Sequence, residues 1–328
     1  MGHDILMLGV DAGGTSTRAV LTTGEGECIG YGVGGRGNPI AVGPDRAADG
    51  VLDAIALALA PSARTLAEVE VVTAAMAGQR AEDGEGGWLA DRLAAEGFSG
   101  RLTFESDLMA TYASGSVEPF GYAIVAGTGA SAVRVAGGRI DATADGLGWL
   151  LGDRGSGFWI GHRVARAVVR DLDHAGPATV LTRGVLEHLG IVEDATRREG
   201  RSRTLEQLVE TLYAMRPIEL AALAPLAFVA GDPVAESILR RAGEHLADSL
   251  AAVLAGPGPL VVGGSVLFRP TPVRDAFLHR LGAAAAGLEL IPVIDGAVGA
   301  GLLAVRAGGA RVSSETFARL SETLSRFR

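Results

Sequence analysis

The chain has 328 residues, of which 48% are hydrophobic and 20% charged, and at about 100–200 residues per domain this length predicts two domains. The net charge of −9 argues against a nucleic-acid partner, which would require a basic surface. No apolar run approaches the roughly 18 residues of a membrane-spanning helix, and the single cysteine, Cys28, excludes an internal disulfide and any metal site built on cysteine pairs. We therefore expect a cytoplasmic protein without membrane or nucleic-acid partners.

The first glycine-rich segment, GVDAGGTSTRAV (9–20), is typical of a β-hairpin whose turn needs glycine for positive φ. Backbone N–H groups of such a turn can converge on an anion, and Thr15, Ser16 and Thr17 add hydroxyl donors. Asp11 would repel phosphate there unless a cation lay between them, so we interpret it as a magnesium ligand acting through water. The alternative is an aspartate that starts the turn and caps its own backbone.

Short apolar runs and amphipathic stretches then alternate. A helix is predicted over 45–60, and an apolar strand at 102–104 leads into Ser106 and Asp107. A structural role that remains open for Asp107 is the N-cap of the helical stretch that follows it, because aspartate is favoured there.

A second segment, IVAGTGASAVRV (124–135), repeats the pattern of the first: an apolar run, a small turn with hydroxyls including Thr128 and Ser131, and another apolar run. Two copies about 115 residues apart indicate two related halves, each giving one hairpin turn to a common site. Coincidence is the alternative, since Gly-Thr turns are common.

Later in the chain, helices are predicted over 232–255 and 272–287, and between them a buried strand runs into Gly263, Gly264 and Ser265. Two glycines at a strand end let a flat group such as a purine lie against the backbone, although tight strand–helix packing needs them equally. The alternation of strands and helices predicts an α/β fold, with its ligand crevice where the strands end. Neither a P-loop nor a Rossmann fingerprint occurs.

In this order the parts resemble the sugar kinase/Hsp70/actin ATPase superfamily, and more closely the BadF/BadG-type ATPase family that includes N-acetylglucosamine and glucosamine kinases. The resemblance covers residues 9–304 and rests on GVDAGGTSTRAVL, RGNP (36–39), AMAG (75–78), SDLMATYA (106–113), AGTGAS (126–131), GWLLGDRGSGFWIG (148–161), VVGGSVL (261–267) and DGAVGAGLLA (295–304). It implies two actin-like ATPase domains, ribonuclease H-like mixed sheets flanked by helices, with an interdomain active-site cleft. We expect them over 1–117 and 118–310, with a helix over 311–328 packing on the first domain.

The resemblance also implies ATP and Mg²⁺ as cofactors. It implies that Asp107 is the catalytic base and contacts the sugar. It also implies that Asp11 is the residue that binds the metal. Asn38, Gly78 and Asp153 would bind the sugar, although Asn38 also suits a turn before Pro39. The expected ATP-binding residues are Gly13, Gly14, Thr15, Ser16, Thr17, Gly127, Thr128, Gly129, Gly263, Gly264 and Ser265.

Two departures from the family's usual run bear on the substrate. Trp149 stands where the family more often has histidine, and Arg154 where it often has a sugar-holding glutamate. A bulkier Trp149 favours an unsubstituted amine, and the acidity of the protein favours a cationic sugar. Arg154 opposes a cationic sugar unless it pairs with Asp153 or points outward. We expect an ATP-dependent kinase that phosphorylates the 6-hydroxyl of D-glucosamine. N-acetylglucosamine, or a broader range of hexoses, is the alternative, and the expected assembly is a homodimer.

Other functions on the same fold are disfavoured by the sequence. A sugar-sensing regulator would carry a DNA-binding helix-turn-helix before the first strand, which here begins at about Ile5. A dehydratase-activating ATPase would need cysteines to hold an iron–sulfur cluster between subunits, and Cys28 lies outside any suitable place.

Overall fold

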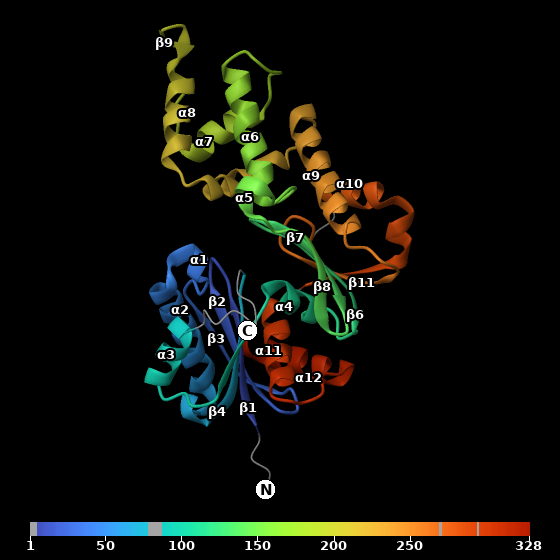
Figure 1. Cartoon of the computed structure of the whole chain (residues 1–328). Helices are drawn as coiled ribbons and strands as arrows, with labels where there is room; N and C mark the ends of the chain where they lie inside the picture. The colour runs from blue at the N-terminus through green and yellow to red at the C-terminus, as the bar shows by residue number, and fades with distance from the viewer. Residues whose placement is uncertain (1–4, 78–86, 269–270, 294) are drawn as a thin grey trace. The chain divides into compact units, whose positions relative to one another are not determined.

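The computed structural model describes residues 5–77, 87–268, 271–293 and 295–328 (Figure 1). The chain divides into two compact units, the first formed by Met1–Ala123, Val135–Ile140 and Ile291–Arg328, and the second by Ile124–Arg134 and Asp141–Leu290. The fold is α/β, with two mixed sheets flanked by helices, as expected. The division differs from the expected domains chiefly at 291–310, which lies with the first unit because its helix packs on the first strand.

The first unit is built on a five-stranded sheet in the order β3-β2-β1-β4-β5. Strands β1, β2 and β3 form an antiparallel meander, while β4 and β5 run parallel to β1. The carboxyl ends of β1, β4 and β5 therefore meet at one edge of the sheet. The strands are β1 Leu6–Ala12, β2 Thr17–Thr23, β3 Cys28–Gly34, β4 Val69–Ala75 and β5 Arg101–Glu105.

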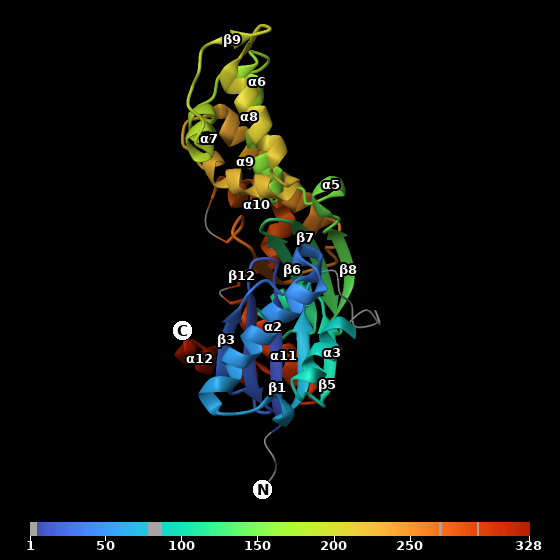
Figure 2. The ribbon, with the colours of Figure 1, turned by 90° about the vertical axis from the view of Figure 1, so that its left-hand side faces the viewer.

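Helices cover both faces of this sheet, with α2 and α3 on one side and α11 on the other (Figures 1 and 2). Alternate residues of β1 face opposite sides: Leu8 and Val10 pack in the core with α2, and Met7 packs with α11. Gly9 lets α11 approach, because a Cβ there would lie 2.3 Å from the carbonyl carbon of Ala300. The helices of this unit are α1 Pro39–Val42, α2 Pro44–Leu59, η1 Ala60–Ser62, η2 Leu66–Glu68, α3 Gly87–Ala95, α4 Asp107–Ala113, α11 Gly296–Ala307, α12 Ser314–Leu324 and η6 Ser325–Phe327.

A second sheet, mostly within the second unit, has the order β12-β11-β6-β7-β8. Its strands are β6 Phe120–Ala126, β7 Ala130–Ala136, β8 Arg139–Asp145, β11 Gly258–Gly263 and β12 Leu288–Pro292. The remaining elements are α5 Gly148–Leu151, α6 Gly157–Leu172, α7 Leu181–Leu189, β9 Arg197–Arg198, β10 Arg201–Ser202, α8 Arg203–Ala214, η4 Pro217–Ala227, α9 Pro233–Ala251, α10 Pro272–Leu281 and η5 Gly282–Gly287.

The two sheets share one strand order, since β8-β7-β6-β11-β12 repeats β3-β2-β1-β4-β5. The segments 9–20 and 124–135 occupy equivalent places, as the first hairpin of each sheet. The interpretation of the sequence echo as two related halves is confirmed. The expected positive φ is wrong, because Gly13, Gly14, Gly127 and Gly129 do not have one.

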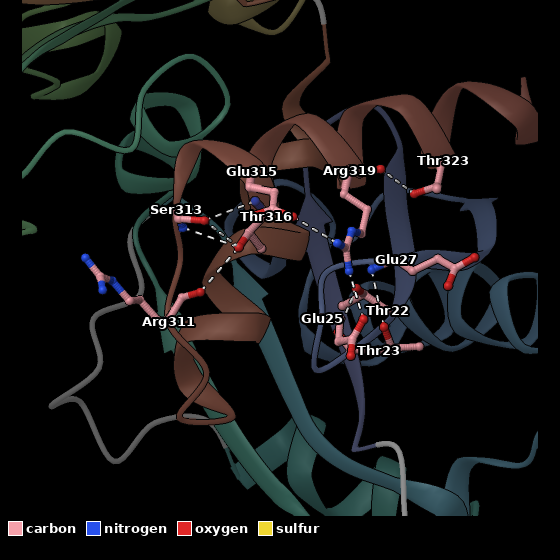
Figure 3. Close-up of polar contacts among 10 residues, drawn as sticks. All are labelled: Thr22, Thr23, Glu25, Glu27, Arg311, Ser313, Glu315, Thr316, Arg319 and Thr323. Carbon is pink, nitrogen blue, oxygen red and sulfur yellow. Dashed lines mark hydrogen bonds and ion pairs between the residues drawn. The ribbon is translucent and has the colours of Figure 1, made fainter.

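Helix α12 belongs to the first unit, where it packs against α11 and β3. Polar contacts join it to the turn between β2 and β3 (Figure 3). Arg319 pairs with Glu25 of that turn at 2.8 Å and with Glu315 of its own helix at 3.2 Å. The buried hydroxyl of Thr323 accepts the Cys28 N–H at 2.9 Å, at the start of β3.

Thr323→Val is expected to destabilise the protein, because valine keeps the shape but leaves the buried N–H of Cys28 without an acceptor. Such an unpaired donor costs about 1–3 kcal/mol. Thermal melting should show a midpoint several degrees lower, whereas Thr323→Ser, which retains the hydroxyl, should melt close to the parent protein. Equal melting of the valine and serine variants would show that this hydrogen bond does not hold α12.

Candidate functional site

Asp11 lies at the carboxyl end of β1, opposite Arg18 of β2. Arg18 Nη1 lies 3.3 Å from Asp11 Oδ2, and a Cβ on Gly296 at the start of α11 would lie 2.8 Å from the same oxygen. Burial raises the pKa of Asp11, Arg18 opposes that rise, and the negative charge of Asp107 adds to it. Asp11 and Asp107 are therefore close enough to influence each other electrostatically.

Asp107 follows β5 and occupies the first turn of α4. Ser106 is the N-cap of that helix, since its hydroxyl accepts the Leu108 N–H at 3.2 Å; the interpretation of Asp107 as the cap is wrong. Asp107 Oδ1 also accepts this N–H, at 3.0 Å. Burial raises the pKa of Asp107, against these hydrogen bonds, which lower it. A carboxylate with a raised pKa holds a proton more readily and suits proton transfer.

The turn between β1 and β2 is tight, with the Gly13 N–H bonded to the Ser16 carbonyl at 3.1 Å. Gly14 and Thr15 are exposed, so their donors are open to a ligand. Thr17 is fully buried and its hydroxyl donates to the Gly35 carbonyl at 2.8 Å. Thr17 thus supports the turn from behind in this structure.

Asn38 is buried and caps the short helix α1, accepting the Ile40 N–H at 2.9 Å. Its amide donates to the Ala77 carbonyl, just beyond β4, at 3.3 Å. The preceding Gly37 N–H donates to the Gly13 carbonyl of the hairpin turn at 3.1 Å. Each polar group of the Asn38 amide retains one hydrogen-bonding position for a ligand. Gly78 lies outside the described residues.

The first unit therefore brings its predicted residues to one edge of its sheet. Asp11 ends β1, Asp107 follows β5, and Asn38 is joined both to the segment after β4 and to the hairpin. This is the edge at which ligands bind in open α/β sheets.

The second unit brings together the turn 127–129 and the end of β11. Gly264 has φ +83°, and a Cβ there would lie 2.4 Å from the Ala126 carbonyl. Gly263 is buried, while Thr128, Gly264 and Ser265 are exposed. A cavity of about 380 Å³ opens here, lined by Gly127, Thr128, Gly157, Ile160, Ala221, Ala224, Pro225, Phe228, Ser265 and Val266. Its largely apolar lining with a few polar groups suits a flat heterocycle.

Several cavity residues were missed by sequence reasoning. Gly157, at the start of α6, donates its N–H to the Gly127 carbonyl at 2.7 Å, and η4 supplies Ala221, Ala224 and Pro225. The apolar composition of η4 is typical of core, and no motif distinguishes it. Gly157 falls within the quoted GWLLGDRGSGFWIG stretch, which was interpreted only for the sugar.

Asp153 lies beside the second hairpin turn in a left-handed conformation, with φ +55°. Its Oδ1 accepts the Ala130 N–H at 3.0 Å, and its own N–H donates to Asp145 at 2.6 Å. Burial raises the pKa of Asp153, the Ala130 hydrogen bond lowers it, and the charge of Asp145 raises it further. One carboxylate oxygen of Asp153 remains for a ligand.

Trp149 and Arg154, the two residues that depart from the usual family sequence, lie near Asp153 in the chain. Trp149 packs on Phe158, with ring centroids 5.8 Å apart, and remains 42% exposed. The Arg154 guanidinium contacts His245 Nδ1 at 2.6 Å and does not pair with Asp153. The two neighbouring side chains therefore have different partners, Arg154 on α9 and Asp153 on β7.

The described ranges contain no cluster of three or more His, Cys, Asp or Glu side chains able to hold a metal ion. Asp11 with Asp107 nearby fits a cation held mainly by phosphate oxygens and water, as magnesium commonly is. In the same described ranges, every helix is too short or too polar to cross a bilayer.

Two mixed sheets of one strand order, each with a glycine hairpin turn at its first two strands, define the actin-like ATPase fold of sugar kinases. The chain belongs to the BadF/BadG/BcrA/BcrD ATPase family, which matches residues 8–304. ATP use is therefore implied by the family.

Named relatives are similar over most of the chain. An N-acetyl-D-glucosamine kinase of Dictyostelium discoideum is 26% identical, covering 92% of this chain and 98% of its own. A glucosamine kinase of Vibrio cholerae is 25% identical, covering 75% and 79%. The solved structure of a candidate N-acetylglucosamine kinase from Chromobacterium violaceum is 25% identical, covers 91% and 99%, and has a TM-score of 0.72.

Proposed function

We propose that the protein is an ATP-dependent amino-sugar kinase that phosphorylates the 6-hydroxyl of D-glucosamine. The observation that carries this proposal is Asp107, a half-buried carboxylate of raised pKa at the sheet edge that also holds Asp11 and the first glycine turn. The names of the relatives support the substrate class.

Asp107 would act as the general base. The sugar oxygen forms a bond to the γ-phosphorus as its proton passes to the Asp107 carboxylate, and the bond to the bridging oxygen breaks, releasing ADP. Positioning dominates such a transfer: Asn38 and Asp153 would orient the sugar, and the cavity at Ser265 would hold the adenosine. Asp11 would hold Mg²⁺ through water, and the bound ion supplies charge neutralisation at the phosphates.

The case for glucosamine over its N-acetyl derivative rests on Trp149 and on the charge of the protein. Trp149 replaces the histidine usual in the family, and its larger side chain leaves less room for an acetamido group. Arg154 opposes a cationic sugar, because its partner His245 is not an anion and it does not pair with Asp153. The overall charge of −9 adds attraction for a cationic sugar. N-acetylglucosamine remains the second candidate, because two of the three relatives above carry its name.

The test compares kcat/KM for glucosamine, N-acetylglucosamine and glucose with ATP and magnesium, and again with a chelator. Glucosamine should be the most efficient substrate, and glucose should be at least about tenfold poorer, because polar partners of the 2-amino group would be left unmatched. The proposal fails if N-acetylglucosamine or glucose is turned over more efficiently. Trp149→His, which restores the usual family residue, should shift the ratio toward N-acetylglucosamine.

A further inference from the structure

A concentration of positive charge lies between α6 and α9 in the second unit, and the proposed reaction does not use it. Arg154 reaches His245 of α9, whose ring meets Trp159 of α6 edge-on at 5.1 Å. The guanidinium of Arg163 lies 5.0 Å above the same Trp159 ring. Arg166 lies one turn after Arg163 on α6, and Arg241 lies one turn before His245 on α9. Burial lowers the pKa of Arg163, and the charges of Arg166 and Arg241 lower it further. We call the four arginines the cation cluster: Arg154, Arg163, Arg166 and Arg241.

The acidic side chains beside the cation cluster pair with arginines outside it. Across the parts of the chain that the structure describes, none of its four arginine side chains pairs with a carboxylate. The neighbouring acids are engaged elsewhere, Glu244 with Arg240 and Asp248 with Arg280. Burial and then Arg154 lower the pKa of His245, against Asp248, which raises it.

Like charges on facing helices repel one another, and a bound anion would relieve this repulsion. Arginine forks bind phosphate oxygens through paired hydrogen bonds, which makes them the usual residues for phosphate recognition. The Trp159 ring already holds the Arg163 guanidinium in place, so that arginine loses less side-chain freedom when an anion binds. The protein as a whole is acidic, with a net charge of −9, so a group of arginines at one place does not follow from its overall composition.

We propose that the cation cluster is a binding site for a phosphate-bearing small molecule, separate from the cavity at Ser265. Arg154 directly follows Asp153, whose carboxylate holds the Ala130 N–H at the end of the hairpin turn. An anion at the cluster would thus bind beside the loop that supports this turn. The site could be filled by a phosphosugar or by a nucleotide, since both offer the same phosphate chemistry.

Calorimetric titration of the full chain with inorganic phosphate tests the proposal, with the nucleotide site first filled by a non-hydrolysable ATP analogue and magnesium. The parent protein should bind phosphate, and Arg163→Gln combined with Arg241→Gln should weaken binding at least about tenfold. Arg240→Gln, on the same helix but paired with Glu244, should bind within about twofold of the parent. Parallel titrations with glucosamine 6-phosphate and ADP distinguish the two sources.

Thermal melting separates binding from a structural role. In phosphate-free buffer, Arg241→Gln should melt at or above the parent temperature, because a repelling charge has been removed. Phosphate should raise the melting temperature of the parent and not that of the double variant; if the double variant does not fold, Arg166→Gln replaces it. Absence of phosphate binding, or binding that the cluster variants leave unchanged, overturns the proposal. The measurements need no turnover, so they stand apart from the kinase assay.

Discussion

Asp107→Asn is expected to lower turnover at least about 100-fold, the usual scale of a general-base contribution, while ATP binding is retained. Asparagine keeps the shape of the side chain and its contact with the Leu108 N–H, but it cannot take the sugar proton. Steady-state kinetics and calorimetric ATP titration of the same preparation measure the two effects. Near-normal turnover by a folded variant would remove Asp107 from the mechanism.

The same variant should be more stable than the parent at neutral pH. Folding raises the pKa of Asp107, so its contribution to stability is present below its ordinary value of 3.8 and is lost as pH rises through the folded value. The neutral asparagine avoids that loss. Melting curves from pH 4 to pH 8 should therefore diverge as pH rises, with Asp107→Asn the higher. Ser202→Ala is the control, since it removes the N-cap of a different helix, α8, and should lower stability by about 1 kcal/mol at every pH.

Gly127→Ala is expected to raise the KM for ATP at least about tenfold without destabilising the protein. Its φ is not positive, and a Cβ there would meet nothing within 4 Å. Since Gly127 lines the cavity beside Ser265, the added methyl group enters space proposed for the nucleotide. ATP titration checks the expected loss of ATP affinity, and thermal melting checks that the stability is unchanged.

Gly264→Ala provides the contrast. Its φ of +83° is strained for alanine, and the new Cβ would lie 2.4 Å from the Ala126 carbonyl. These effects should together cost at least about 2 kcal/mol of unfolding free energy. If Gly127→Ala bound ATP like the parent, the turn 127–129 would not be a phosphate cradle, whatever the behaviour of Gly264→Ala.

The sequence was sufficient to predict the α/β class and both glycine hairpins, because their patterns are local: apolar strands, small turns and hydroxyls at fixed spacing. The equivalence of 9–20 and 124–135 was visible for the same reason. The edge of the first sheet that holds the site could also be predicted, since Asp11 lies at the end of one predicted strand and Asp107 shortly after another, and the carboxyl ends of parallel strands meet.

Other features depend on contacts between distant segments. Helix α11 joins the first unit because Gly9 accommodates Ala300, a packing that no local pattern announces. Ser106 rather than Asp107 caps α4, although both residue types are good caps and stand side by side. The sequence of η4 is apolar like that of any core segment, and only the structure shows that η4 lines the cavity together with Thr128.

The place of α11 in the first unit has a consequence for how the chain is made. The face of β1 that carries Met7 and Gly9 is covered by a helix that begins about 190 residues after β5 ends. At about 5–20 residues per second, a ribosome needs roughly 10–40 s to deliver it. During that interval the nascent first unit presents an uncovered apolar sheet face, and the whole second unit emerges before the first is complete. The first unit is therefore the first to be synthesised and the last to finish folding.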